Sequence, residues 1–190
     1  MRHLNGTYID ERCVYMRHLG KGMEGSAALY VDVVTGEVVV VKTYTGLIRN
    51  GIPAHLAGDF AGLSLQWPVE IEAGLLIGSW MNGNESSFVP VRDYFIPKSG
   101  SLKPHWAMAT PFIEAGTLMD LATATNVHER TPQKLDKVFR HVFNTILENL
   151  RPLHAVGYCH DDIKPDNIFI ASTAHWLLGD LGNVRHFDHP

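Results

Sequence analysis

The chain has 190 residues, of which 45% are hydrophobic, so it is long enough to bury a core as one domain or as two small lobes. Sixteen basic and twenty acidic side chains are interspersed and give a net charge of −4, which argues against a nucleic-acid surface or a polybasic membrane-binding tract. We expect no secretory signal and no membrane span, because no apolar run is long enough for either. With only two cysteines, the composition predicts a cytoplasmic protein, the nucleus being the alternative reducing compartment.

The first part of the chain is predicted to be rich in strands and to contain one helix. The helix is expected over 68–80, because Pro68 suits a first helical turn and apolar residues follow on one side. The predicted strands are short runs rich in Val, Tyr and Ala, bounded by turn residues, at 13–19, 27–34, 38–43, 88–96 and 106–110.

A long amphipathic helix is predicted over 131–155. Thr131 is a suitable N-cap, and Pro132 suits the first helical position. Three-and-four spacing places the apolar residues on one face. These residues are Leu135, Val138, Phe139, Val142, Phe143, Ile146, Leu147, Leu150 and Leu153.

The most informative segment is YCHDDIKPDN at 158–167, which is followed by Asp-Leu-Gly at 180–182. It resembles the protein kinase family, whose catalytic loop runs His-Arg-Asp-x-Lys-x-x-Asn before an Asp-Phe-Gly. Two positions depart from that pattern, since Asp161 stands where the arginine is usual and Leu181 replaces the phenylalanine. Asp, Asn and Pro favour turns in any protein, so each of these residues could occur in an ordinary loop. A preference for turn residues does not explain why five of them stand at the spacing of the catalytic-loop pattern.

The resemblance implies an α+β, bilobal, protein-kinase-like fold. Residues 1–111 would form a small lobe of antiparallel β-sheet with one main helix, 112–116 the hinge, and 117–190 an incomplete helical large lobe. Because the sequence stops at Pro190, before an activation segment, we expect a kinase-like domain that lacks its C-terminal part. The apolar stripe of 131–155 would then need another partner, and self-association through this helix is expected.

The resemblance also assigns catalytic and metal-binding roles. Asp162 would orient the attacking hydroxyl and accept its proton, and Lys164 would neutralise charge on the transferring phosphate. Asn167 and Asp180 would bind magnesium.

A lysine of the small lobe completes the implied catalytic set. Lys42 ends the apolar strand Val-Val-Val-Lys and would lie over the α- and β-phosphates of ATP. Its carboxylate partner is predicted to be Glu72, because Leu75 and Leu76 follow it at the family's spacing. Glu70 remains the alternative, since two residues apart on a helix the two carboxylates cannot face the same way.

The nucleotide site is implied to begin at the glycine-rich stretch 19–25. Spaced glycines let backbone amides approach phosphates, and a strand rather than a Rossmann helix is predicted to follow them. Near 110–120, main-chain groups would read the purine, and Thr117 with Asp120 would lie near the ribose. The implied nucleotide-binding residues are Leu19, Gly20, Gly22, Gly25, Val40, Lys42, Thr110, Pro111, Ile113, Thr117 and Asp120.

The resemblance therefore implies ATP- and magnesium-dependent phosphoryl transfer to Ser or Thr of a protein substrate. The charge distribution predicts no nucleic-acid or membrane partner. One alternative is a catalytically weak or inactive pseudokinase that binds nucleotide and acts as an interaction module. Another is a small-molecule phosphotransferase of the kinase-like superfamily, which usually lacks a lysine at the position of Lys164. The eleven histidines show no zinc-site spacing.

Overall fold

The computed structural model divides the chain into two compact units. The first unit comprises 1–72 and 91–112, and the second comprises 73–90 and 113–190. None of the helices in the described part of the chain is both long and apolar enough to cross a membrane. The residues that the structure describes are 8–9, 12–22, 25–44, 68–80, 86–97, 105–173 and 175–188.

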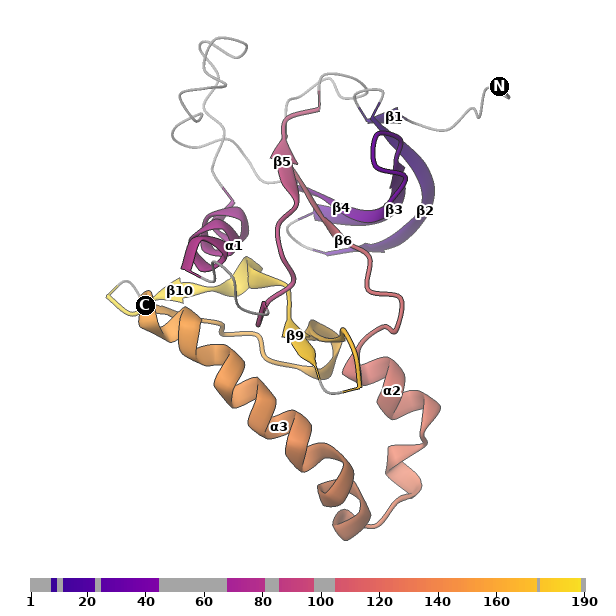
Figure 1. The fold of residues 1–190 in the computed structure, drawn as a ribbon, viewed down its shortest axis with the longest axis vertical. Helices are drawn as coiled ribbons and strands as arrows, with labels where there is room; N and C mark the ends of the chain where they lie inside the picture. The colour runs from indigo at the N-terminus through magenta and orange to yellow at the C-terminus, as the bar shows by residue number, and fades with distance from the viewer. Residues whose placement is uncertain are drawn as a thin grey trace. The chain divides into compact units, whose positions relative to one another are not determined.

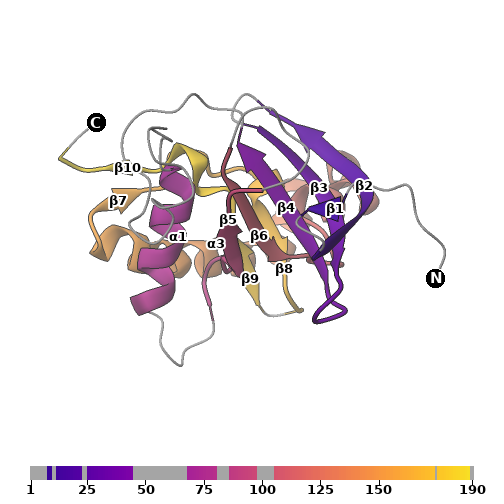
Figure 2. The ribbon, with the colours of Figure 1, turned by 90° about the horizontal axis from the view of Figure 1, so that it is seen from above.

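The first unit is built on a six-stranded antiparallel sheet, whose strongly curved strands are seen in Figures 1 and 2. The strands lie in the order β1-β2-β3-β4-β6-β5. Two of the buried side chains on this sheet are Val41 and Ala107, at 1% and 0% exposure. The strands are β1 (Tyr8–Ile9), β2 (Cys13–Lys21), β3 (Gly25–Asp32), β4 (Val38–Tyr44), β5 (Asp93–Phe95) and β6 (Ala107–Pro111).

An arginine joins three segments of this sheet. The Arg12 guanidinium lies 2.9 Å from the Asp32 carboxylate at the end of β3, and it also pairs with Asp93 of β5. Asp32 is 4% exposed and accepts a further hydrogen bond from the Val34 backbone N–H, at 2.9 Å. The arginine and the turn therefore stabilise a buried negative charge.

The strand predicted over 88–96 is much shorter than expected. Only Asp93–Phe95 forms β5 of the sheet. Pro90 interrupts the stretch, because proline has no N–H to donate to a ladder. Phe88 instead forms an isolated bridge with Leu178, and the Val89 N–H donates to the Leu178 carbonyl at 2.8 Å. These contacts explain why 73–90 belongs to the second unit although 1–111 was predicted as one lobe.

The second unit contains helices and short two-stranded ladders. The helices are α2 (Leu118–Ala124) and α3 (Pro132–Ala155), while α1 (Val69–Trp80) begins in the first unit. One ladder pairs β8 (Ile168–Ile170) with β9 (Trp176–Leu178), and the other pairs β7 (Tyr158–Cys159) with β10 (Arg185–His186). The 3-10 helices among the described residues of this unit are η1 (Val127–Glu129), η2 (Pro165–Asn167) and η3 (Leu181–Asn183). The sheet-based first unit and the helical second unit confirm the α+β, two-lobed class.

The long helix begins and ends close to its predicted limits, but its cap differs. Thr131 has the extended backbone of an N-cap and Pro132 occupies the first turn, yet the Thr131 side chain makes no capping hydrogen bond. Asn149 anchors the helix by donating to the Trp176 carbonyl of β9 at 2.6 Å. The N-terminus of α3 is thus stabilised by the fixed φ of Pro132 and not by a hydrogen bond from the Thr131 side chain.

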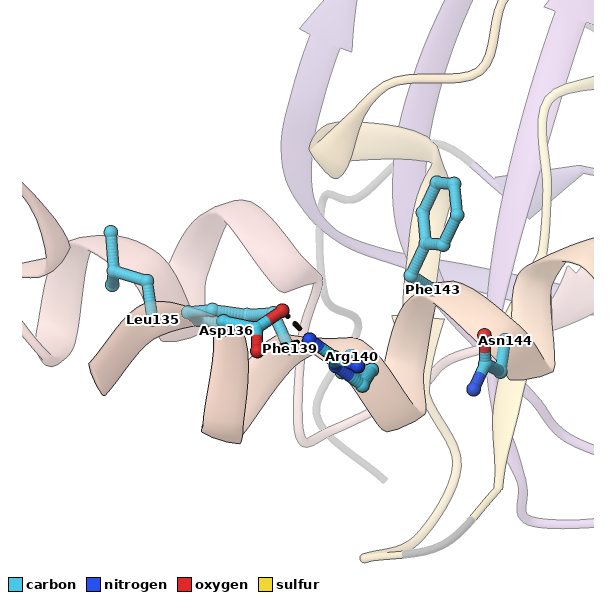
Figure 3. Close-up of a pocket in the computed structure, with 6 residues that line it drawn as sticks. All are labelled: Leu135, Asp136, Phe139, Arg140, Phe143 and Asn144. Carbon is cyan, nitrogen blue, oxygen red and sulfur yellow. Dashed lines mark hydrogen bonds and ion pairs between the residues drawn. The ribbon is translucent and has the colours of Figure 1, made fainter. Parts of the chain in front are cut away.

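The apolar stripe of α3 is buried along only one edge. Leu153 and Val142 are 0% and 5% exposed, whereas Phe143 and Leu147 are 64% and 50% exposed. Figure 3 shows the ring of Phe143 projecting from the helix. A shallow groove of about 510 Å³ lies along this part of the helix. The residues that line the groove are Leu135, Asp136, Phe139, Arg140, Phe143 and Asn144.

Candidate active site

The β8–β9 ladder brings two predicted metal-binding residues to one end. Ile168 pairs with Leu178, and just beyond this pair the Gly179 N–H donates to the Asn167 carbonyl at 2.9 Å. Asp180 follows Gly179 directly. The backbone register thus places Asn167 and Asp180 at the same edge of the ladder, although 13 positions separate them in the sequence.

The Asp162 carboxylate is the centre of a hydrogen-bonded cluster. Its Oδ2 lies 2.7 Å from Lys164 Nζ and accepts hydrogen bonds from the side-chain amides of Asn167 and Asn183, at 3.0 and 3.4 Å. The hydrogen bond from Lys164 is the main reason that the pKa of the Asp162 carboxyl lies below its ordinary value. The same contact raises the pKa of the Lys164 ammonium. At neutral pH this aspartate is therefore anionic and can accept a hydrogen bond from a hydroxyl group.

His160 connects the catalytic loop to the strand before Asp180. It is 1% exposed, and its Nε2 lies 3.1 Å from the Gly179 carbonyl, while its Nδ1 lies 3.4 Å from the Asp162 backbone N–H. Burial lowers the pKa of the imidazole, so the neutral ring is favoured. The two partners then fix the tautomer, because Nε2 must donate to the carbonyl and Nδ1 must accept from the amide. His160 thus positions the loop through these two hydrogen bonds.

The donor atoms near Asp162 fit magnesium. The Asn167 amide nitrogen donates to both the carbonyl and Oδ2 of Asp162, at 2.9 and 3.0 Å, so its oxygen is the atom that can bind a cation. Asp180 adopts a left-handed φ of 57°, a conformation that is costly for a non-glycine residue and common at functional sites. Magnesium prefers such oxygen ligands and usually takes only one or two carboxylates, the rest coming from water and phosphates.

A zinc-type site has no support in the described ranges. No group of three or more His, Cys, Asp and Glu side chains among those residues could hold a metal ion. A site with few protein ligands is compatible with magnesium, because Mg²⁺ usually takes its remaining ligands from water and substrate phosphates.

Asp161, which departs from the family pattern, is engaged in an ion pair. It has a left-handed φ of 60°, and its carboxylate pairs with the guanidinium of Arg185 in β10. The register of the β7–β10 ladder places Arg185 opposite Cys159, two residues before Asp161. The ion pair and the ladder together attach the start of the catalytic loop to the strand that follows Asp-Leu-Gly.

Lys42 pairs with a different carboxylate from the one predicted. Its Nζ lies 2.5 Å from Oε2 of Glu70, which is 5% exposed. Glu72 is on the exposed side of α1, so the prediction of Glu72 as the partner is wrong. The inference relied on the apolar residues after Glu72, but Leu75 and Leu76 are each 38% exposed. The buried side of the helix instead carries Glu70 with Ile71 and Ala73.

Tyr44 is a site residue that the sequence reasoning missed. Its hydroxyl donates to Oε2 of Glu70 at 2.6 Å, the same oxygen that Lys42 contacts. The signal was present in the sequence, because residues two apart on a strand share a face, and Tyr44 follows Lys42 at that spacing. Asn183 and Arg185, which contact Asp162 and Asp161, were also missed, although they lie within three residues of Asp-Leu-Gly.

The glycines of the predicted phosphate loop differ in their surroundings. The β2–β3 hairpin is closed by a hydrogen bond from the Gly22 N–H to the Gly25 carbonyl, at 2.8 Å. A Cβ on Gly25 would lie 1.9 Å from the Thr43 carbonyl oxygen, so this glycine is required for packing against β4. A Cβ on Gly20 or Gly22 would meet nothing within 4 Å. The neighbouring Leu19 is 38% exposed. The open space beside Gly20 and Gly22 would allow a ligand to approach the backbone of this loop.

The predicted purine-binding residues lie along the end of β6 and the segment after it. Thr110 pairs with Val40, and Pro111 pairs with Val39, so these residues continue the sheet. The Ile113 carbonyl accepts the Gly116 N–H at 3.1 Å and retains a second lone pair.

Thr117 and Asp120 form a capping box at the start of α2. The Thr117 N–H and hydroxyl donate to Asp120 Oδ2 at 2.8 and 2.9 Å, and the Asp120 N–H donates to the Thr117 hydroxyl at 3.2 Å. The first of these bonds is the main reason that the pKa of Asp120 is lowered. Both side chains thus have a structural role, which the prediction of a ribose contact did not include.

Comparison with known proteins agrees with this chemistry. Residues 88–190 match the family described as the protein kinase domain. The chain is 36% identical over 78 residues to the Rho-associated protein kinase let-502 of Caenorhabditis briggsae, which covers 41% of this chain and 6% of that protein. It is 25% identical to mitogen-activated protein kinase 13 of Bos taurus and 26% identical to the serine/threonine-protein kinase UCNL of Arabidopsis thaliana. Each of these two alignments covers 92% of this chain, but only 41% and 38% of the respective relative. The match to the family over more than half of its length, together with the catalytic-loop geometry, shows that the chain belongs to the protein kinase family.

Proposed function

We propose that this chain transfers the γ-phosphoryl group of ATP to a Ser or Thr hydroxyl of a protein substrate, with magnesium as cofactor. The observation that carries the proposal is the cluster around Asp162, whose carboxylate is held by Lys164, Asn167 and Asn183. Lys164, two residues after Asp162, is the feature that resembles Ser/Thr-type kinases, and one relative is named a serine/threonine-protein kinase.

Asp162 is the residue that handles the substrate hydroxyl. The hydroxyl oxygen forms a bond to the γ-phosphorus, the bond from that phosphorus to the β–γ bridging oxygen breaks, and the hydroxyl proton passes to the carboxylate. A carboxylate with a lowered pKa is a weak base, so Asp162 mainly orients the hydroxyl and receives its proton late. This order suits the loose transition state of phosphoryl transfer.

Two lysines and the implied metal ligands would stabilise negative charge on the phosphates. Lys164 neutralises charge that develops on the transferring phosphoryl group, and Lys42 binds the α- and β-phosphates. The Asn167 amide oxygen and the Asp180 carboxylate would hold magnesium, which supplies positive charge to the phosphate oxygens when bound.

We also assign the two units to the two lobes of the family fold. The division of the chain between Phe112 and Ile113 supports a hinge at 112–116. The first unit would supply the glycine loop and Lys42, and the second unit would supply the catalytic loop.

The test combines binding with catalysis. Thermal unfolding is measured with ATP, with and without magnesium, and phosphate transfer to a generic protein substrate is then measured for the wild type and Asp162→Asn. We expect a magnesium-dependent rise in unfolding temperature and a loss of transfer of about 10²- to 10⁴-fold in Asp162→Asn. Asp166→Asn is the matched control, because Asp166 is an exposed carboxylate of the same loop.

Two results would contradict the proposal. Transfer that survives Asp162→Asn would remove Asp162 from its assigned role. A magnesium-dependent shift without any transfer by the wild type would favour the alternative, a nucleotide-binding interaction module.

A further inference from the structure

We propose that Tyr44 is a positioning residue, which holds the Glu70 carboxylate in place for Lys42. The inference deepens the proposed function, and it rests on that function only for its effect on nucleotide binding. Tyr44 belongs to the first unit and is not one of the residues assigned to the nucleotide or to the substrate hydroxyl. Its hydroxyl contacts Glu70, the carboxylate partner of Lys42.

The geometry places two donors on one carboxylate oxygen. Lys42 and Tyr44 are two residues apart on β4 and so project from the same face of the sheet. Lys42 Nζ lies 2.5 Å and the Tyr44 hydroxyl 2.6 Å from Oε2 of Glu70. The ammonium also lies 5.4 Å from the centroid of the Tyr44 ring, within the range of a cation–π contact.

Burial explains why a second donor matters. Glu70 and Tyr44 are 5% and 7% exposed, so water contributes little to the solvation of this carboxylate. An ionised carboxylate in such a site is stable only when hydrogen bonds replace the lost water. Lys42 and Tyr44 supply two such hydrogen bonds to one oxygen of Glu70. The neutral hydroxyl of Tyr44 therefore helps to keep the Glu70 carboxylate in place.

The tyrosine is itself held by packing. It belongs to a buried cluster with Ile71, Ile96, Trp106 and Met108. Its hydroxyl also lies 3.7 Å from the Met108 sulfur, a much weaker acceptor than a carboxylate oxygen. The ring position is thus fixed by apolar contacts, and the single hydroxyl proton is directed to Glu70.

Loss of the hydroxyl should release Glu70 toward water and leave Lys42 less restrained. The experiment measures the rate at which an amine-selective acylating reagent modifies Lys42, located by peptide mass spectrometry. Four proteins form a cycle: the wild type, Tyr44→Phe, Glu70→Gln and the double variant. Tyr30→Phe is the matched control, because Tyr30 is a buried tyrosine of the neighbouring strand β3.

We expect Tyr44→Phe to accelerate the labelling of Lys42 about 3- to 10-fold, the factor that corresponds to one ordinary hydrogen bond. In the Glu70→Gln background the same change should have no further effect, because Tyr44 acts through Glu70. Tyr30→Phe should leave the rate unchanged. Circular dichroism checks that each variant is folded.

Unchanged labelling in Tyr44→Phe, or equal acceleration with and without Glu70, overturns the inference. If Tyr44→Phe does not fold, 3-fluorotyrosine introduced at position 44 replaces it. The fluorinated phenol is a stronger hydrogen-bond donor than tyrosine, so it should hold Glu70 more firmly and slow the labelling of Lys42. An unchanged labelling rate overturns the inference. A second series includes magnesium and ATP: absence of protection in the wild type counts against the proposed function, while the labelling cycle still decides the role of Tyr44.

Discussion

Asp161 pairs with Arg185, and this contact joins a residue with a left-handed backbone near the start of the catalytic loop to the strand that follows Asp-Leu-Gly. In the family pattern an arginine stands at the position of Asp161 and can bind a phosphate on the activation segment. Here the charges of the pair are supplied by the chain itself. The ion pair at this position is therefore formed by two side chains of the chain, without a phosphate group.

The first prediction concerns this pair. Asp161→Arg and Arg185→Asp should each lower phosphate transfer about 3- to 10-fold, and the double variant should recover most of the loss, because the pair is restored with its signs exchanged. The effect on the free energy of unfolding should be about 1 kcal/mol or less, since both side chains are partly exposed. Arg140→Ala, which breaks the exposed ion pair with Asp136 on α3, is the control. If phosphate transfer by the double variant is reduced by the product of the two single reductions, the pair has no positioning role.

The second prediction separates the two glutamates of α1. Glu70→Gln should lower the free energy of unfolding by about 1–3 kcal/mol, because Lys42 and Tyr44 lose a charged acceptor in a buried site. It should also weaken the binding of magnesium and ATP about tenfold. Glu72→Gln is the matched control and should change stability by less than about 0.5 kcal/mol. Chemical denaturation and nucleotide titration check both values, and equal effects of the two variants would contradict the pairing.

The third prediction contrasts two glycines of the β2–β3 hairpin. Gly25→Ala should destabilise the chain by about 2 kcal/mol or more, because its Cβ would overlap the Thr43 carbonyl. Gly20→Ala meets open space, so stability should change by less than about 0.5 kcal/mol. Any loss of nucleotide affinity in Gly20→Ala would then come from the ligand site and not from misfolding. Thermal unfolding of both variants is the measurement, and a stable Gly25→Ala would show that β4 can move.

The fourth prediction concerns acid. The hydrogen bond from Arg12 lowers the pKa of Asp32 below its ordinary value of 3.8. A lowered folded-state pKa means that the stabilisation is complete above 3.8 and is lost as the pH falls through the folded-state value. The free energy of unfolding should therefore fall on acidification below about pH 4. Asp32→Asn should flatten this dependence, and Asp136→Asn, at an exposed carboxylate, should not. Identical acid profiles in the wild type and Asp32→Asn would exclude Asp32 as the cause.

The fifth prediction concerns self-association of the chain. Phe143 and Leu147 are one helical turn apart and largely exposed, so a second copy that presents the same stripe would bury both. Phe143→Ser with Leu147→Ser should shift the sedimentation profile at high micromolar concentration toward the monomer. Asn144→Ser, at an exposed polar position on the same helix, should not. A monomeric wild type at this concentration would contradict the prediction.

Short-range sequence patterns determined the main secondary-structure elements and the residues of the catalytic loop. The Val-rich run of β4, the periodicity of α3 and the offsets from Asp162 to Asn167 depend on neighbours within a few residues, which a sequence displays directly. These offsets predict the loop residues by number, and the structure holds Asp162, Lys164 and Asn167 in one cluster.

Only the tertiary structure decided which side chains form ion pairs and hydrogen bonds with one another. Whether Glu70 or Glu72 meets Lys42 depends on which side of α1 faces the sheet, and the apolar residues of that helix did not reveal it. Likewise, the Asp161–Arg185 pair and the contact of Tyr44 with Glu70 join residues 24 and 26 positions apart. Such contacts depend on which elements the fold brings together, a constraint that acts in space and that the spacing of residues along the chain does not specify by itself. For Glu70 the compensation of a buried charge adds to this constraint.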